Sequence, residues 1–376
     1  MDEQLGFGPE DILDSINDGV YVTDTTRKIV YWGGAAEQIT GWRAADIIGK
    51  HCYDGVLCHV DKDGHRLCGE EYCPLHRCIA TGQSSTFPVV VFAQTRAGGR
   101  VPLSVSVAPI RDGGGEVIGG VETFRDLSAE FDDLKRVKKI QAISMGADLP
   151  EDDRIRFSTH YIPHDIVGGD YYAIAKVGPE RYGFLLADVT GHGVAAALYT
   201  MYLNSLWRSS CDLLVNPGKF ARVVGARLHQ LTREDTPFAA GVCGVFDLEA
   251  NELRVTGAGS PPGLLFRSDG SRSHVEARGL PLGVLEDASY AEAAVRIGPG
   301  DRILFFTDGA TEIFNESGAQ LGVEGLAGIL AELGYPASGV SFGAVEKRML
   351  AWSDRIRFDD DLTFLEVRIA EPTSDA

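Results

Sequence analysis

A change in the spacing of apolar residues divides this chain and limits what it can fold into. Between residues 127 and 145 apolar side chains recur every three or four positions, the period of one helix face. This stripe consists of Leu127, Phe131, Leu134, Val137, Ile140 and Ile143, and Pro150 ends the pattern. A chain of 376 residues is long enough for two or three domains. The sequence therefore predicts two globular units joined by a helix.

The first unit alternates β-rich runs with turns. Strands are expected at 20–24, 29–32, 88–94, 101–110 and 117–124. Thr-Thr-Arg-Lys separates the first two runs, and glycine-rich turns at 97–99 and 112–115 separate the last three. Three antiparallel strands after a loop-rich middle predict an α+β domain.

The second unit mixes apolar strands with amphipathic helices and ends near residue 369. Its expected strands are 184–187, 240–247, 253–257, 264–266, 303–306 and 362–369. Its expected helices are 194–209, 217–232, 323–333 and 340–353.

The charge balance excludes some classes of partner. The chain has 35 Lys and Arg against 54 Asp and Glu, a net charge of −19 that opposes binding to nucleic acid or anionic membranes. The longest apolar stretch, Gly193–Trp207, is too short to span a bilayer. Acidic residues stand at the start, where a secretion signal needs basic ones. We therefore expect a cytoplasmic protein with neither nucleic acid nor membrane as a partner.

Aspartates recur beside glycines at the ends of strands in the second unit. The four motifs are Val167-Gly168-Gly169-Asp170-Tyr171-Tyr172, Leu186-Ala187-Asp188-Val189-Thr190-Gly191-His192-Gly193, Phe306-Thr307-Asp308-Gly309-Ala310-Thr311-Glu312 and Phe358-Asp359-Asp360-Asp361-Leu362-Thr363. Carboxylates at strand ends can point into a shared cleft, and carboxylate oxygens select hard cations such as Mg²⁺ or Mn²⁺. The alternative is that each Asp only caps a turn, which is harder to sustain for four motifs together.

From roughly Arg156 to Arg368 the second unit resembles the PPM metal-dependent Ser/Thr phosphatases. It is most similar to their bacterial branch, which includes the sporulation stage II protein E phosphatase and stress-response regulators of sigma factors. The aspartate motifs carry this resemblance, together with Ala258-Gly259-Ser260-Pro261-Pro262-Gly263 and Gly279-Leu280-Pro281-Leu282-Gly283, in the family's order. The resemblance implies a hydrolase with an α-β-β-α sandwich that binds two Mn²⁺ or Mg²⁺ ions.

The resemblance also implies a role for each matched residue. Asp188 would bridge two metal ions, and the carbonyl of Val189 would complete one coordination shell. Asp308 and Asp360 would hold the ions from the other side, and Asp170 would bind directly or through water. A metal-activated water would attack phosphorus in line, so that no phosphoenzyme forms.

Some positions depart from the family or stay open. Ala173 stands where the family often has a second Asp, and the phosphate-binding Arg of eukaryotic members has no counterpart that we can place. His192 could act as a general acid, but its place just before a helix favours a packing or capping role. Asp361 is expected to be solvated or to cap a strand rather than to be a third ligand.

The first unit resembles a PAS sensor domain between about Pro9 and Ser128. The matching segments are 12–20, 22–24, 35–42 and 47–50, and Thr123-Phe124-Arg125-Asp126-Leu127-Ser128 resembles the exit strand that leads into a signalling helix. The two resemblances predict an α+β chain with a PAS domain at 8–126, a linker helix at 127–150 and a phosphatase domain at 151–370.

Five of the seven cysteines fall in one stretch of the first unit, with histidines between them. They are Cys52, Cys58, Cys68, Cys73 and Cys78. No Cys-x-x-Cys pair is present, yet a thiolate-rich group can bind Zn²⁺ or an iron–sulfur cluster, or be oxidised. The alternative is a loop insert with inert thiols. Metal, if bound, is expected to depend on Cys68, Cys73 or Cys78.

A flavin is not expected in the first unit. Light-sensing PAS domains place a reactive Cys after Gly-x-Asn and before Arg-Phe-Leu-Gln. The segment Gly49-Lys50-His51-Cys52-Tyr53-Asp54 keeps the Cys but lacks the groups that would contact the flavin.

Two functions remain in view. The first is a PAS-regulated protein phosphatase whose substrate, by resemblance, is a phosphorylated anti-sigma-factor antagonist. The second is a degenerate phosphatase fold that docks a partner under PAS control. Retention of the four aspartates favours the enzyme, whereas Ala173 favours the binding module. The helical stripe either packs within its own chain or forms a parallel homodimer, and we expect the homodimer.

Overall fold

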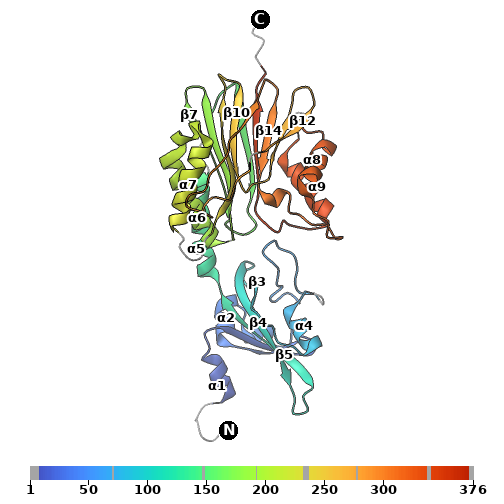
Figure 1. Cartoon of the computed structure of the whole chain (residues 1–376). Helices are drawn as coiled ribbons and strands as arrows, with labels where there is room; N and C mark the ends of the chain where they lie inside the picture. Colours follow the sequence, from blue (N-terminus) through green and yellow to red (C-terminus); the bar gives the residue numbers. More distant parts are fainter. Residues whose placement is uncertain are drawn as a thin grey trace. The chain divides into compact units, whose positions relative to one another are not determined.

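Neighbouring strands run antiparallel throughout the described residues, where they form three five-stranded sheets (Figure 1). The computed structural model describes residues 8–69, 72–145, 149–191, 193–231, 237–276, 278–336 and 340–371. The chain divides into two units, Met1–Asp133 and Leu134–Ala376. Within the described residues, no helix combines the length and the apolar character needed to cross a membrane.

The first unit contains one sheet with the strand order β2-β1-β5-β4-β3. Its strands are β1 (Gly19–Asp24), β2 (Ile29–Trp32), β3 (Val89–Gln94), β4 (Arg100–Arg111) and β5 (Val117–Asp126). Its short helices are α1 (Pro9–Asp14), α2 (Gly34–Thr40), α3 (Ala44–Ile47) and α4 (Pro74–Thr81). All five predicted strands are present, and the α+β expectation for this unit is confirmed.

The β1–β2 hairpin shows why the sequence turns between these strands. The carboxylate of Asp24 accepts hydrogen bonds from the backbone N–H groups of Thr26 (2.8 Å) and Lys28 (3.0 Å). Such Asx bonds replace the backbone bonds that a turn leaves unmade. The turn sets the register Tyr21↔Trp32, and the Tyr21 ring lies 5.3 Å from that of Trp32 in the core.

Helix α5 (Ser128–Met145) confirms the helix predicted from the apolar stripe. Its last turns bury Gln141 and Met145, whereas Ile140 and Ile143 are 53% and 76% exposed. The apolar stripe is therefore not the face that packs within the second unit.

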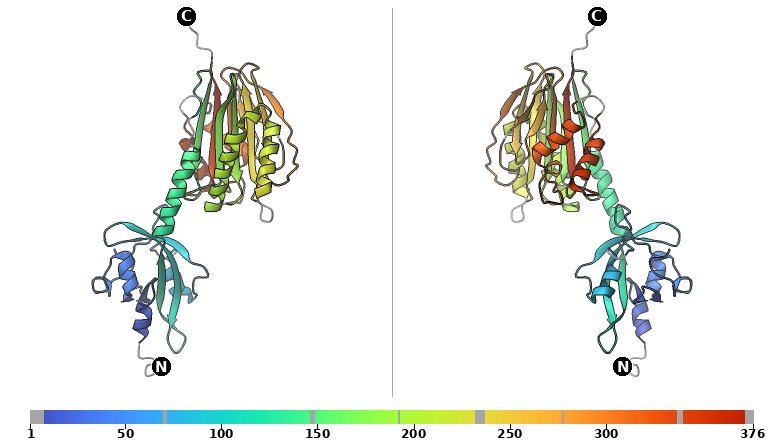
Figure 2. Two further views of the ribbon diagram at one scale, coloured as in Figure 1. Left: turned by 90° about the vertical axis from the view of Figure 1, so that its left-hand side faces the viewer. Right: turned by 90° about the vertical axis from the view of Figure 1, so that its right-hand side faces the viewer.

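The second unit contains two sheets with the orders β13-β10-β9-β8-β7 and β12-β11-β14-β15-β6. The first has β7 (Asp170–Gly178), β8 (Arg181–Val189), β9 (Ala239–Asp247), β10 (Glu252–Ala258) and β13 (Ala293–Arg296). The second has β6 (Ile155–Ile162), β11 (Gly263–Phe266), β12 (Arg272–Val275), β14 (Arg302–Phe306) and β15 (Leu362–Ile369). Helices α6 (Val194–Ser210) and α7 (Pro217–Leu231) cover one sheet, and α8 (Gly322–Glu332) and α9 (Phe342–Ser353) cover the other (Figures 1 and 2).

Alternation along the central strands creates this four-layer sandwich. In β8, Phe184 and Leu186 face the core between the sheets, whereas Leu185 and Ala187 pack under the helices. Successive strand residues point to opposite faces, so a strand covered on both sides is apolar throughout. The predicted α-β-β-α architecture is confirmed.

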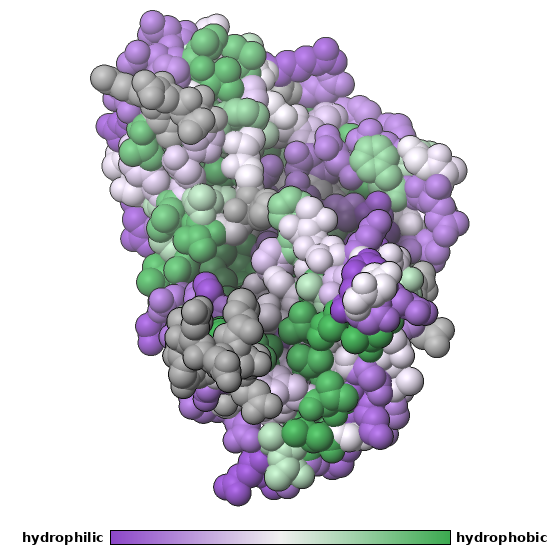
Figure 3. Space-filling model, turned by 90° about the horizontal axis from the view of Figure 1, so that it is seen from below, coloured by the Kyte–Doolittle hydropathy of each residue, from purple (hydrophilic) through white to green (hydrophobic). Residues whose placement is uncertain are grey.

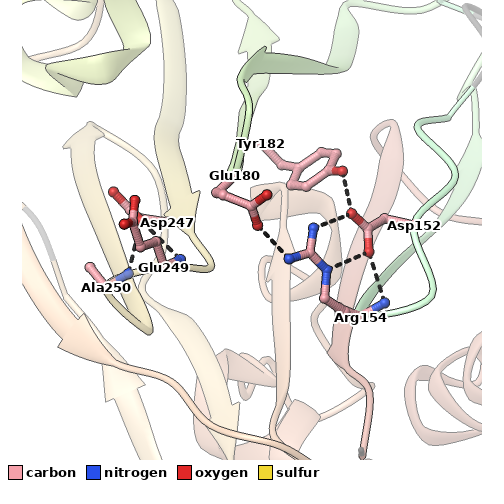
Figure 4. Close-up of polar contacts among 7 residues, drawn as sticks. All are labelled: Asp152, Arg154, Glu180, Tyr182, Asp247, Glu249 and Ala250. Carbon is pink, nitrogen blue, oxygen red and sulfur yellow. Dashed lines mark hydrogen bonds and ion pairs between the residues drawn. The ribbon is translucent and has the colours of Figure 1, made fainter. Parts of the chain in front are cut away.

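A polar cluster closes one end of the sandwich (Figure 4). Arg154 bonds Asp152 through two nitrogens and also pairs with Glu180 in the turn between β7 and β8. Tyr182 donates a hydrogen bond of 2.6 Å to Asp152. The hydrogen bonds from Arg154 hold the pKa of Asp152 below its ordinary value. The nearby Asp247 accepts from the backbone of Glu249 and Ala250, so polar contacts fix the turns at this end.

Apolar residues also reach the surface. On the face drawn in Figure 3, hydrophobic residues gather in several patches, with hydrophilic residues around them. Single exposed apolar side chains, such as Leu231 at 53%, are normal for folded proteins and identify no site alone.

The sequence did not predict four strands, β6, β7, β12 and β13. Two of these, β12 and β13, are four-residue edge strands with exposed polar or small residues, so they lack an apolar run. The other two are also edge strands, and β7 begins at the glycine-flanked Asp170.

Candidate functional site

The four aspartates of the strand-end motifs come from neighbouring strands of the two sheets. Asp170 begins β7 and stands directly opposite Asp188 in β8. Asp308 follows β14, and Asp360 precedes β15. Burial, followed by the charges of Asp308 and Asp360, raises the pKa of Asp188 to about 8. Carboxylates that perturb one another in this way share one small region.

Glycines beside these aspartates permit a close approach of backbone segments. A Cβ atom on Gly169 would lie 2.6 Å from the carbonyl oxygen of Val189. A Cβ on Gly309 would lie 2.0 Å from the carbonyl oxygen of Asp361. Larger residues at either position would push the loops apart, which explains why Gly accompanies Asp in both motifs.

Two threonines hold Asp170 in the core between the sheets. The carboxylate of Asp170 is fully buried, and one of its oxygens accepts from the hydroxyls of Thr307 (2.9 Å) and Thr363. The backbone N–H of Thr363 in turn donates to the Thr307 hydroxyl at 3.0 Å. Burial and the charges of Asp188 and Asp361 raise the pKa of Asp170 well above its ordinary value.

Asp361 is buried rather than solvated, and its carboxylate links two backbone segments. It is 3% exposed, and its carboxylate accepts from the backbone N–H groups of His164 (2.6 Å) and Gly169. Of the two roles expected from the sequence, the structure therefore contradicts solvation and favours capping. The hydrogen bond between Gly169 and the Asp361 carboxylate connects the loop before β15 to the Gly-Gly-Asp turn that contains Asp170.

Some carboxylate oxygens in this cluster have no partner. One oxygen of Asp170 and one of Asp308 are buried without any hydrogen bond. Burial and the charges of Asp360 and Glu312 raise the pKa of Asp308. A buried, unsatisfied carboxylate is costly, and a bound cation would satisfy both oxygens.

The donor set fits hard divalent cations. The available groups are carboxylate and carbonyl oxygens, which Mg²⁺ and Mn²⁺ prefer. Within the described residues, no three carboxylates of this cluster have oxygens within 4.8 Å of one another.

The remaining candidates are placed as follows. Asp360 is exposed, and its carboxylate accepts from the backbone N–H of Asp361 at 2.8 Å. Val189 is buried near the end of β8. A small cavity that includes Ser260 and Thr307 in its lining joins Asp188 to Asp308. His192 lies outside the described residues.

Sequence reasoning missed one residue that reaches this region from the helix. Gln141 in α5 is 3% exposed, and its amide nitrogen donates to the carbonyl of Gly168 (2.7 Å) and to the hydroxyl of Thr200 (3.0 Å). Gln141 stands between apolar residues, and nothing in the local pattern predicts that it is buried. The role of Gln141 is visible only from its hydrogen bond to the carbonyl of Gly168, which is distant in sequence.

A second acidic group lies in the first unit. Oxygens of Asp61 and Asp63 and a ring nitrogen of His65 lie within 4.8 Å of one another on an exposed loop. Asp61 accepts from the backbone N–H groups of both Asp63 and His65 at 2.9 Å. These bonds account for the cluster as a capped turn.

Comparisons with known proteins agree with this geometry. A family model described as Stage II sporulation protein E (SpoIIE) matches residues 178–370. A model described as PAS fold matches residues 13–130.

Individual relatives match about half of the chain at low identity. The phosphoserine phosphatase RsbP of Bacillus subtilis is 26% identical over 183 residues, which cover 48% of this chain and 45% of RsbP. The phosphoserine phosphatase RsbU of the same organism is 24% identical over 199 residues, covering 52% and 59%. The chain thus spans about half the length of these curated relatives. The solved SiaA-PP2C domain of Pseudomonas aeruginosa aligns at a TM-score of 0.54 and 21% identity, covering 64% of this chain and 99% of that domain, and supports the fold.

We expect the substitution Asp188→Asn to stabilise the metal-free protein at pH 8 by about 1–2 kcal/mol, because it removes one charge from a repelling cluster. Mn²⁺ should raise the melting temperature of the natural protein but not of this variant. Differential scanning fluorimetry with and without chelator measures both effects. The control is Asp287→Asn, which removes an exposed charge. An equal rise in melting temperature with Mn²⁺ in Asp188→Asn and in Asp287→Asn would contradict the expected role of Asp188.

We expect Thr363→Val to lower the free energy of unfolding by about 1–3 kcal/mol, because the buried Asp170 loses a hydrogen-bond donor. Urea denaturation measures the loss. In a double-mutant cycle with Asp170→Asn, the changes in stability caused by the two substitutions should not add. Simple additivity would show that this hydrogen bond contributes nothing to stability.

Proposed function

The chain belongs to the stage II sporulation protein E (SpoIIE) family, and from this we propose that its second unit is a metal-dependent protein phosphatase. Its substrates would be phosphoserine or phosphothreonine in a protein. The proposal includes the division into a PAS sensor domain at 8–126, a linker helix at 127–150 and a phosphatase domain at 151–370.

The buried, unpartnered oxygens of Asp170 and Asp308 carry this proposal. A domain that served only to dock a partner would have no need to bury carboxylate oxygens without partners. Asp188, between them in the sequence, also carries a pKa raised to about 8. Raised carboxylate pKa values concentrate at sites that hold cations or perform acid–base chemistry.

In the proposed site each residue has a distinct part. Asp188 would contact both cations with its carboxylate, and the carbonyl of Val189 would complete one shell. Asp308 and Asp360 would bind from the opposite sheet, and Asp170 would bind with its free oxygen or through water. When bound, Mn²⁺ or Mg²⁺ would activate water and offset the charge of the phosphoryl group.

The buried hydrogen bonds would keep these donors in place. Thr307 and Thr363 fix the orientation of Asp170, and the hydrogen bond to the Asp361 carboxylate fixes the turn at Gly169. A site held by rigid strands binds cations without first ordering its ligands. Substrate phosphate would enter on the side of Asp360, which is exposed.

The relatives suggest the class of substrate. RsbP and RsbU are named phosphoserine phosphatases, and we propose a phosphorylated anti-sigma-factor antagonist as the substrate of this chain. Dephosphorylation would let the antagonist capture an anti-sigma factor and release a sigma factor. The PAS fold would control the reaction, with its thiols as candidate sensing groups.

The exposed part of α5 supports a homodimer in this proposal. Ile140 and Ile143 are 53% and 76% exposed, while Leu134 and Val137 are half-buried. Ile140 and Ile143 lie one turn apart on the helix, and a second copy of the same helix would cover them. Gln141 on the buried face contacts the turn before Asp170 through Gly168, so movement of the helix pair would reach the catalytic ligands.

The activity test is phosphate release from a phosphoprotein in the presence of Mn²⁺. We expect Asp188→Ala to abolish release and to leave the circular dichroism spectrum unchanged, because one carboxylate contacts both cations. Asp308→Ala and Asp360→Ala should be nearly inactive and partly rescued by high metal, whereas Asp170→Ala should weaken only the second cation. Activity of Asp188→Ala like that of the natural protein, at saturating Mn²⁺, would refute the assignment. No metal-dependent release from the natural protein would favour the docking module.

The dimer test is light scattering on the full chain. We expect a dimer for the natural protein and a monomer for Ile140→Asp or Leu134→Asp, because an unpaired charge in an apolar seam must be desolvated. The control Ala142→Asp adds the same charge at another exposed position of α5 and should remain dimeric. A natural protein that is monomeric at high micromolar concentration would exclude this seam as a dimer interface.

A further inference from the structure

Strand β7 has a cavity on the side that faces the helices of the second unit. Tyr171, Ala173 and Ala175 alternate along β7 and pack toward the apolar layer that contains α6. Tyr171 is fully buried, whereas the two alanines are half-buried. Alanine side chains are short and β7 is the edge strand of its sheet, so space remains beside the strand. The cavity there has a volume of about 500 Å³.

Part of the lining of this cavity is apolar and deeply buried. Met145 and Trp207 belong to it and are 5% and 6% exposed. The ring of Trp207 packs edge-on against that of Phe220, with 5.9 Å between the ring centroids, which holds this wall in place. Leu149 and Pro150 extend the apolar lining. Cavities of about 300–1,000 Å³ with mostly apolar walls are typical of sites that bind small molecules.

A few polar groups converge on the same cavity. The hydroxyl of Tyr171 donates a hydrogen bond to the Oδ1 atom of Asn204 at 3.2 Å, and both residues line the cavity. The amide N–H groups of Asn204 have no acceptor among the described residues, so they are able to donate to a ligand. Because β7 is an edge strand, its backbone also offers donors and acceptors that no neighbouring strand uses.

The charges around this cavity are positive in an otherwise acidic chain. Arg208 and Lys176 belong to the lining, and both are exposed to solvent. No Asp or Glu is present among the described residues that line the cavity, although the whole chain has a net charge of −19. The ammonium group of Lys176 lies 5.5 Å from the centroid of the Tyr182 ring, and within the described residues Arg208 forms no ion pair. Such a lining attracts an anion and offers nothing to a metal ion.

The cavity lies where helix α5 meets strand β7. Ser144 and Met145, in the last turn of α5, belong to its lining, and Met145 packs in the same apolar layer as Tyr171. Tyr171 directly follows Asp170, the first residue of β7. A molecule in the cavity would contact the helix and the strand together, so its binding would stabilise the packing of the end of α5 on β7.

From this arrangement we propose that the cavity binds a small organic anion with an apolar body. The apolar body would lie against Ala173, Ala175 and Trp207. The anionic group would lie at the exposed mouth, where Arg208 would bind it through charge-assisted hydrogen bonds and Asn204 would donate another. This site uses none of the carboxylates that would hold the cations, and the proposal does not depend on phosphatase activity.

The first test titrates the full chain with anilinonaphthalene sulfonate, a fluorescent probe that joins an apolar ring system to an anionic group. We expect saturable binding at one site per chain. The uncharged analogue phenylnaphthylamine lacks the sulfonate and should bind about tenfold more weakly. Inorganic sulfate lacks the apolar body and should not displace the probe at the same concentration. Absence of saturable binding would overturn the proposal, as would equal binding of the uncharged analogue or displacement by sulfate.

The second test uses variants to locate the bound probe. Arg208→Gln removes a positive charge at the mouth and should weaken binding of the probe about tenfold. Ala175→Leu fills the cavity and should abolish binding at this site. The matched control is Arg222→Gln, which removes an exposed arginine of the neighbouring helix α7 outside the lining and should bind like the natural protein.

Circular dichroism shows whether each variant is folded. If Ala175→Leu does not fold, the exposed position of Arg208 still decides the outcome, because a change there leaves the core intact. Binding that is unchanged in a folded Ala175→Leu or in Arg208→Gln would overturn the proposal. An equal loss of affinity in Arg222→Gln and Arg208→Gln would also overturn it, since the probe would then respond only to the net charge of the chain.

Discussion

In the second unit, several buried carboxylates gather at one end of the sandwich, and this arrangement costs free energy on which the rest of the unit depends. Asp170 and Asp188 lie opposite each other on paired strands, and each raises the cost of charging its neighbours. Threonine hydroxyls satisfy one oxygen of Asp170, while its second oxygen and one of Asp308 have no partner. The fold therefore loses stability at positions that a bound cation would satisfy. Stability retained elsewhere must offset this loss.

Side-chain alternation explains how the two sheets can support such a site. In β14, Phe305 faces the core between the sheets, whereas Leu304 and Phe306 pack under α8 and α9. The ring of Phe305 lies 4.7 Å from that of Phe184 in the opposite sheet. Contacts of this kind hold the sheets in fixed register. Strand ends on different sheets can thus place carboxylates together with little flexibility.

The sequence predicted the architecture and the positions of the aspartates because both depend on local patterns. Its failures have physical causes. The apolar stripe suggested that Ile140 and Ile143 are covered, yet the structure buries Gln141, whose amide has partners in Gly168 and Thr200. Likewise, the density of cysteines indicated thiol chemistry but did not show which of the five thiols are buried. Which polar groups become neighbours depends on contacts between segments distant in sequence, and no local period encodes those contacts.

The two units bury polar groups of different chemical character. Oxygen donors at the end of the sandwich favour hard cations, whereas the sulfurs of Cys68 and Cys73 favour softer metals. Backbone N–H groups point at these sulfurs, while the oxygens of Asp170 and Asp308 that lack partners have no such donors. Carboxylates held by rigid strands suit ions that accept oxygen ligands, whereas thiols release their protons only to a metal that binds sulfur strongly.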